Sequence, residues 1–356
     1  MIDLDSLDQI KTLDKGNYLG SIEALADQVR QTWEEVQEIV VPEAYQKVNK
    51  IILNGMGGSS FGGLVVKSVF ADRLKVPLDV INSYEVPAYV DENTLFIFAS
   101  YSGTTEEILA TVDEALARGA KCLGVSADGK LGEILTERNL PYFQIQPKFN
   151  PSNQPRAGLG YSIIGVAGLL KQSGLLDFST TDIDKITAVL QKANESYGVS
   201  VRMEDNLAKK YALESIGKIL ILAAAGHLAG SVHVFRNQLH ETAKNFADYF
   251  LFSELNHHLM ESLSHPWTNS DNLLFLQIHS DFYHPGIKKR LSITKDVIEQ
   301  NKIKALEFQP LSGNKLSEAF EVIGFGGYCS FYLGMLNGVD PSFIPWVDYF
   351  KEKLSG

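Results

Sequence analysis

Short apolar runs alternate with helical segments through the first half of the chain, and this alternation restricts the fold more than any other feature. The runs lie at residues 50–54, 78–81, 95–99, 122–126 and 142–145, and each is short enough to be a buried strand. Helical segments separate most of them, and the chain before about residue 47 also has helical spacing. The alternation predicts a parallel sheet with helices on both faces.

The second half repeats this pattern, with a long polar helix expected to about residue 215 and strands expected at 218–224, 275–278 and 305–308. A Gly-containing loop at 225–231 weakly resembles the glycine-rich loop at 55–63 of the first half. A polar stretch near 173–185 marks a boundary, and 356 residues are enough for two domains. We therefore predict an α/β fold of two doubly wound parallel-sheet units. One unit covers residues 1–175, with a helical lead-in to about 47, and the other covers 176–356.

A hydroxyl-rich turn joins the strand at 95–99 to the next helix. It contains Ser100, Ser102, Thr104 and Thr105, and Thr104 with Glu107 resembles a capping box that starts the helix. Hydroxyls and free N–H groups at a helix N-terminus suit a phosphate dianion. The alternative is an ordinary turn whose hydroxyls cap only their own backbone.

A second loop, Gly-Met-Gly-Gly-Ser-Ser-Phe-Gly-Gly at 55–63, follows the strand at 50–54. Its spacing excludes a dinucleotide-binding fingerprint, because Ser60 stands where the third Gly belongs, and no Gly-Lys-Ser/Thr of a Walker A loop follows. Both loops would lie at strand carboxyl ends, where open α/β sheets bind ligands. This shared edge strengthens the assignment of each loop as a ligand-binding loop.

Composition limits the partners and the compartment. A net charge of −11 and a pI near 5.3 oppose nonspecific binding to nucleic acid or to an anionic membrane. Cys122 and Cys329 suggest neither a disulfide framework nor a zinc cluster. No secretory signal and no apolar run of membrane-spanning length are visible, which predicts a soluble, cytoplasmic protein without nucleic-acid or membrane partners.

The two loops resemble those of the sugar isomerase (SIS) domain. Together with Gln-Pro-Arg-Ala at 154–157, His-Glu-Thr-Ala-Lys at 240–244, Glu-Leu-Asn-His at 254–257 and Gly-Val-Asp-Pro at 338–341, they make the chain similar to bifunctional phosphoglucose/phosphomannose isomerases over roughly residues 35–354. The resemblance implies interconversion of glucose or mannose 6-phosphate with fructose 6-phosphate in carbohydrate metabolism. It also implies two SIS-type subdomains, a homodimer, and neither metal nor organic cofactor.

The resemblance also implies the site residues. Gly57, Gly58 and Ser59 would border the substrate, and Ser100, Ser102 and Thr105 would hold its phosphate. The catalytic roles would fall on Arg156 beside C1 and C2, Glu241 as the base, His257 in ring opening, and Lys351 on the terminal helix.

Three departures from the family pattern leave the substrate open. His240 replaces an Asn, residues 255–259 read Leu-Asn-His-His-Leu instead of Leu-Asn-His-Asn-Glu, and Thr104 replaces an Asn. The preferred epimer is therefore undecided, and another phosphosugar is an alternative substrate. A noncatalytic sugar-phosphate-binding or regulatory protein is the alternative of a different class.

The residues themselves support some of these roles. Glu241 is expected within a mostly apolar helix that continues through Phe246 and Ala247, which would partly sequester its carboxylate. Without these neighbours, Glu241 would be interpreted as an ordinary charge on a helix surface. His257 and His258 are adjacent and point in different directions on a helix, which disfavours a shared metal. Lys351 borders an apolar stripe on the terminal helix and is expected to reach inward.

Overall fold

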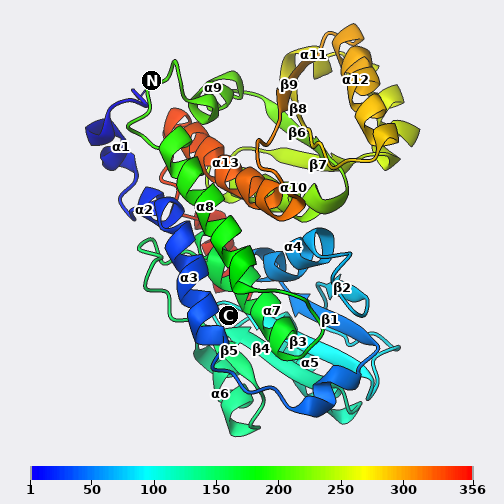
Figure 1. The fold of residues 1–356 in the computed structure, drawn as a ribbon. Coiled ribbons are helices and arrows are strands. Elements are labelled where there is room, and N and C mark those ends of the chain that lie inside the picture. The colour runs from blue at the N-terminus through cyan, green and yellow to red at the C-terminus, as the bar shows by residue number, and fades with distance from the viewer. Residues whose placement is uncertain (1, 355–356) are drawn as a thin grey trace.

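Two parallel sheets, one above the other in Figure 1, form the framework of the computed structural model, which describes residues 2–354. The first sheet has the order β2-β1-β3-β4-β5 and the second has the order β7-β6-β8-β9. Every pair of neighbouring strands is parallel. The strands are β1 (Lys50–Gly55), β2 (Leu78–Ile81), β3 (Thr94–Ser100), β4 (Lys121–Ser126), β5 (Tyr142–Gln144), β6 (Ile219–Ala224), β7 (Ala247–Leu251), β8 (Leu273–Ile278) and β9 (Lys304–Phe308).

Helices lie on both faces of the sheets, so the predicted fold class is confirmed. The α-helices are α1 (Leu7–Leu13), α2 (Tyr18–Glu23), α3 (Leu25–Val36), α4 (Phe61–Val69), α5 (Glu106–Ala117), α6 (Gly129–Glu137), α7 (Leu159–Gln172), α8 (Thr180–Tyr197), α9 (Leu207–Glu214), α10 (Ala229–Glu241), α11 (Asn269–Asn272), α12 (Pro285–Gln300), α13 (Lys315–Leu336) and α14 (Pro345–Leu354). Short 3-10 helices are η1 (Glu43–Lys47), η2 (Gly57–Ser60), η3 (Pro155–Ala157), η4 (Gly226–Leu228), η5 (Glu254–His257) and η6 (Leu259–Ser264).

The apolar runs form strands because they can be buried on both faces. All of β3 is buried: Ile97 belongs to the large core, whereas Phe96 and Phe98 pack with α5 and α6 on the other face. Each predicted strand is present with bounds within two residues of those expected. The helical lead-in is also present, as α1, α2, α3 and η1.

Two predictions about helices are wrong. The long helix expected to reach about residue 215 is divided into α8 and α9. The helix that carries Glu241 ends at that residue, because the chain turns through Lys244 at φ +54° and the Asn245 N–H donates to the Leu239 carbonyl. The segment after this turn is β7, an edge strand that the sequence analysis did not predict.

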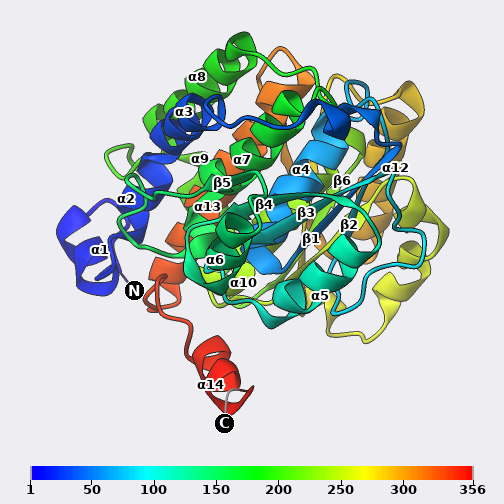
Figure 2. The same ribbon diagram turned by 90° about the horizontal axis from the view of Figure 1, so that it is seen from below.

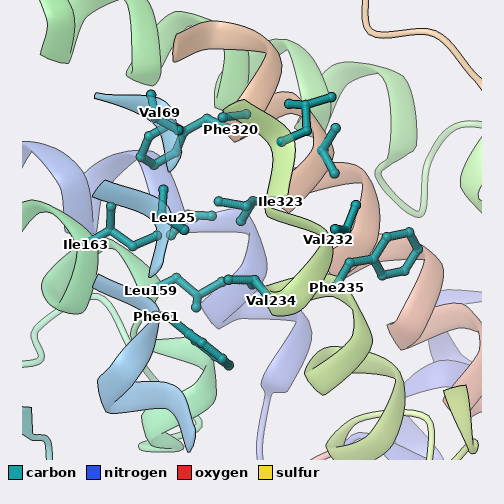
Figure 3. Close-up of a cluster of buried hydrophobic side chains, with 14 of the residues drawn as sticks. Leu25, Phe61, Val69, Leu159, Ile163, Val232, Val234, Phe235, Phe320 and Ile323 are labelled. Atoms are coloured by element: carbon teal, nitrogen blue, oxygen red, sulfur yellow. The ribbon is translucent and has the colours of Figure 1, made fainter. Parts of the chain in front are cut away.

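Helices α4, α7, α10 and α13 lie between the two sheets and bury the main core (Figures 1 and 3). In Figure 3, Phe61 of α4, Ile163 of α7, Val232 of α10 and Phe320 of α13 belong to one cluster of buried hydrophobic side chains. Contacts between α4 and α10 connect the two halves of the molecule. Gly230 permits this close crossing, since a Cβ there would lie 2.5 Å from the Leu64 carbonyl oxygen.

Helix α13 corrects the expectation that no apolar segment is long enough to span a membrane. By length and composition alone it could do so. In the structure, however, 89% of its 18-residue apolar window is buried inside the fold, where it contacts α8, α9 and α10. It is the central core helix of this fold.

Candidate active site

The glycine-rich loop forms η2, at the carboxyl end of β1. Gly57 has φ +50°, a conformation that favours glycine. Gly58 lies against η3, and a Cβ there would be 3.4 Å from the Arg156 Cα. The Ser59 hydroxyl accepts a 2.9 Å hydrogen bond from the Tyr101 N–H, which joins this loop to the hydroxyl-rich turn. The structure therefore brings the two predicted loops and Arg156 together at one sheet edge.

The hydroxyl-rich turn follows β3 and leads into α5. Ser100 Oγ lies 2.7 Å from Thr105 Oγ1, and it accepts a hydrogen bond from the Gly103 N–H. Ser102 is exposed, and its hydroxyl lies 3.0 Å from that of Thr104. Gly103 is required here because it has φ +69° and a Cβ would collide with the Asp128 carbonyl oxygen.

The predicted capping box is wrong. Helix α5 begins at Glu106, so Thr105 is its N-cap residue, and no side-chain hydrogen bond caps the helix there. The Thr105 hydroxyl is bonded to Ser100 instead. An N-terminus without a side-chain cap keeps N–H groups available for an anion.

Arg156 is held rigidly in a buried position on η3, with 2% of its side chain exposed. Its Nη1 donates to Gln154 Oε1 at 2.9 Å, and its Nη2 donates to the carbonyl oxygens of Pro341 and Ser342 at 2.6 and 3.0 Å. The guanidinium carbon lies 5.4 Å from the centre of the Tyr18 ring. Its Nε is buried without a hydrogen-bond partner within residues 2–354. Arg156 is thus a fixed positive charge whose Nε–H could still donate a hydrogen bond.

Glu241 lies beside Arg156, with Oε2 3.7 Å from Nη1 and 30% of the side chain exposed. Burial raises the pKa of this carboxyl above its usual value, and the charges of Arg156, Lys244, His240 and Lys351 oppose the rise. Its partial sequestration was predicted, but for the wrong reason. Phe246 is 70% exposed and lies beyond the helix, and the burial comes from tertiary neighbours.

Two further residues belong to this cluster, and the sequence analysis gave them no role. Tyr18 is buried under Arg156, and its hydroxyl accepts a 3.0 Å hydrogen bond from Thr242. Lys244 donates to the Glu241 carbonyl at 2.6 Å and to the Pro341 carbonyl at 3.3 Å. Tyr18 is 224 residues from Thr242, so no local pattern could reveal it. For Lys244 the available signal was its place three residues after Glu241.

Lys351 lies on α14, which projects from the body of the molecule (Figure 2). No residue of α14 is buried, and the apolar stripe beside Lys351 (Phe343, Val347, Phe350 and Leu354) is 40–62% exposed. Lys351 is exposed as well, so the expectation that it reaches inward is wrong within one chain. The charge of Lys351 is nevertheless among those that lower the pKa of Glu241. Its ammonium group is therefore close enough to influence the candidate base.

His257 is not brought to this cluster within one chain. Glu241 ends α10, and the chain then enters β7 at its amino end; His257 is exposed on η5, beyond the carboxyl end of β7. A five-residue strand separates these two edges of the sheet by roughly 13 Å. Of the other nine predicted site residues, eight lie on segments that meet around Arg156, and Lys351 acts electrostatically on Glu241.

A cavity of about 570 Å³ lies elsewhere, between α4, α10 and β7. None of the ten predicted site residues lines it.

Comparisons with known proteins agree with this architecture. The family model for the SIS domain matches residues 44–137, and the model described as the bacterial phospho-glucose isomerase C-terminal SIS domain matches residues 204–354. A solved structure of a hypothetical protein from Thermus thermophilus superposes with a TM-score of 0.71 over 95% of this chain and 91% of that one. At 16% identity this likeness shows the fold alone.

Curated relatives are similar over nearly the whole chain. A bifunctional phosphoglucose/phosphomannose isomerase of Caldicellulosiruptor bescii is 32% identical over 94% of this chain and 98% of its own length. A protein of the same name from Aquifex aeolicus is 25% identical over 90% of this chain and 94% of its own length. The chain therefore belongs to the bifunctional phosphoglucose/phosphomannose isomerase family.

Proposed function

We propose that this protein interconverts glucose 6-phosphate and/or mannose 6-phosphate with fructose 6-phosphate through a cis-enediol intermediate. The Arg156–Glu241 pair carries this proposal: a carboxylate whose pKa is raised by burial lies 3.7 Å from a buried guanidinium. Isomerisation needs a base that moves a proton between C1 and C2, and a fixed positive charge that stabilises the enediolate. Membership of the family supports the same reaction.

The two loops would bind the substrate away from the reacting carbons. Ser100, Ser102 and Thr105 present hydroxyls at the start of α5, where a phosphate is favoured by the helix dipole. The backbone at Gly57, Gly58 and Ser59 would border the sugar between the phosphate and Arg156. The phosphate would thus fix the orientation of C1 and C2 relative to Glu241.

The ring-opening step suggests a homodimer. An imidazole, as in His257, can both donate and accept a proton near neutral pH, which suits exchange with the ring oxygens. Because Glu241 and His257 lie at opposite edges of the second sheet, we infer that a second copy of the chain supplies His257 to the site. The exposed aromatic residues Phe343, Trp346 and Phe350 follow Pro341 and Ser342, which bind Arg156, along the chain, and they support an interface on this segment.

We also infer two functional units, 1–175 with the phosphate loops and 176–356 with Glu241, His257 and Lys351. A hexose phosphate is a charged metabolite that does not cross membranes unaided, which favours a cytoplasmic location.

A coupled assay of the purified protein with glucose, mannose and fructose 6-phosphates tests the proposed reaction. Turnover of one or both aldose phosphates to fructose 6-phosphate is expected. Turnover of a different phosphosugar alone would change the substrate but keep the reaction. Binding of sugar phosphates without any turnover would favour the noncatalytic alternative, for which the altered residues 255–259 are the motive.

A further inference from the structure

Lys244 has a backbone conformation that lysine rarely adopts. Its φ of +54° lies in the left-handed region, which costs an L-residue other than glycine or asparagine roughly 1 kcal/mol or more. Within residues 2–354 the other non-glycine residues with positive φ are Asn17, Asn139, Asn153 and Lys302. A lysine with this backbone conformation beside the candidate site therefore calls for an explanation in terms of function.

The side chain of Lys244 converges with Arg156 on one oxygen atom. Lys244 Nζ lies 3.3 Å from the Pro341 carbonyl oxygen, and Arg156 Nη2 donates to the same oxygen at 2.6 Å. The groups that act electrostatically on Lys244 are Arg156, Asp340 and Glu241. Lys244 is exposed as a residue, but partial desolvation and the charge of Arg156 lower its pKa to about 8, although Asp340 and Glu241 oppose this shift. Two cations therefore share an acceptor that carries no net charge.

Helix capping explains only part of this arrangement. A lysine near a helix C-terminus often bonds the last carbonyl groups, and the 2.6 Å bond to the Glu241 carbonyl is such a contact. Capping does not require that Lys244 also reach the acceptor used by Arg156. An oxygen that carries a negative charge would interact with this pair of cations more strongly than a carbonyl does.

We propose that Lys244 acts with Arg156 to stabilise the negative charge that develops on the sugar oxygen during isomerisation. The proposal rests on the isomerase function proposed above. When Glu241 takes the proton from C2 of the open-chain aldose, the C–H electron pair forms the C1–C2 double bond and the carbonyl π pair moves to O1. O1 would replace the Pro341 carbonyl as the shared acceptor. The proton of the O2 hydroxyl then passes to O1, and the electron pair it leaves on O2 forms the C2=O bond while the C1=C2 pair takes the proton back from Glu241 at C1.

Kinetics of Lys244→Met and Lys244→Arg test this role. Loss of one preorganised donor to a developing oxyanion is expected to lower kcat by about 10²–10³-fold in Lys244→Met, with a small change in KM. Lys302→Met is the matched control, because Lys302 has the same left-handed backbone and is exposed at the end of α12. This control should have wild-type kinetics. Wild-type kcat in a folded Lys244→Met variant would overturn the proposal and leave capping as the role.

The pH profile separates the charge of Lys244 from its packing. The wild-type kcat/KM should fall as the pH rises through about 8, where the Lys244 ammonium loses its proton. A guanidinium keeps its proton, so this alkaline decrease should be absent in Lys244→Arg. If Lys244→Met does not fold, the arginine variant decides: an alkaline decrease identical to that of the wild type would contradict the proposal.

Binding gives a measurement that does not depend on turnover. The probes are a five-carbon sugar acid 5-phosphate, whose carboxylate mimics the planar anionic enediolate, and the corresponding pentitol 5-phosphate, which is neutral at that end. Calorimetry should show that the wild type prefers the acid, and that Lys244→Met loses about tenfold or more of that preference. If the wild type is active and Lys244→Met keeps the same preference for the acid, only the proposed role of Lys244 is overturned. Wild type that neither isomerises hexose 6-phosphates nor prefers the acid overturns both proposals.

Discussion

Glu241 and Arg156 are the residues on which the proposed chemistry depends. Glu241→Gln keeps the size of the side chain but cannot take up and return a proton. We expect kcat to fall by roughly 10²–10⁴-fold or more with KM little changed, since Arg156 and the phosphate loops are intact. Steady-state kinetics measure this, with the exposed Glu254→Gln as a control. Near-normal turnover in Glu241→Gln would mean that another residue is the base.

The same substitution has a predictable effect on stability. Burial raises the pKa of Glu241 in the folded protein, so its ionised form opposes folding, and its contribution to stability is lost as the pH rises through the folded pKa. Glu241→Gln should therefore be at least as stable as the wild type at neutral pH. The difference in the free energy of unfolding should shrink below pH 4.5, the ordinary value for this carboxyl. Urea denaturation at several pH values measures it. A less stable variant at neutral pH would show that attraction to Arg156 outweighs burial.

The hydroxyls of the phosphate loop should affect binding more than chemistry. The phosphate is remote from C1 and C2 and is held alike in the ground and transition states, so Ser102→Ala with Thr105→Ala should raise KM more than it lowers kcat. Ser292→Ala, on the exposed surface of α12, serves as the control. An unchanged KM in the double variant would remove this loop from substrate binding.

At the scale of elements, packing within one chain gives little support to a role for helix α14. It carries Lys351, which influences Glu241 electrostatically although the helix buries none of its residues. Lys351→Ala should impair turnover of a ring-closed sugar phosphate more than that of an open-chain analogue. Lys353→Ala is the matched control, since Lys353 lies over the Tyr349 ring at 5.7 Å on the same helix. Equal losses on both substrates, measured by initial rates, would assign Lys351 a packing role.

At the scale of the whole molecule, the position of His257 predicts a shared active site. Glu241→Gln and His257→Ala should each be inactive alone. Mixed dimers would contain one site with both residues intact if the partner subunit supplies His257, so an equilibrated mixture should recover about one quarter of wild-type activity. Co-refolding followed by assay and sedimentation velocity tests this. Absence of recovery in a mixture shown to be dimeric would place Glu241 and His257 in the same subunit's site or exclude His257 from it.

The sequence alone determined the two sheets and the site edge. Continuous apolar runs such as β3 have few alternatives to a buried parallel strand, and loops that follow parallel strands must meet at one edge. The strand β7 escaped prediction because it is a partly exposed edge strand whose Asp248 interrupts the apolar pattern. The capping box failed because Thr105, not Thr104, is the N-cap, and its hydroxyl bonds to Ser100.

Only the tertiary structure decided the surroundings of the proposed base. The contacts of Arg156 with Tyr18, Glu241 and Pro341 join segments more than 80 residues apart, and no periodicity encodes such contacts. The turn at Lys244 ends α10 and directs the ammonium group of Lys244 toward Pro341, and it could not be predicted from the sequence either. Local sequence preferences specify strands and turns over a few residues, whereas the burial that raises the pKa of Glu241 exists only after distant segments pack together.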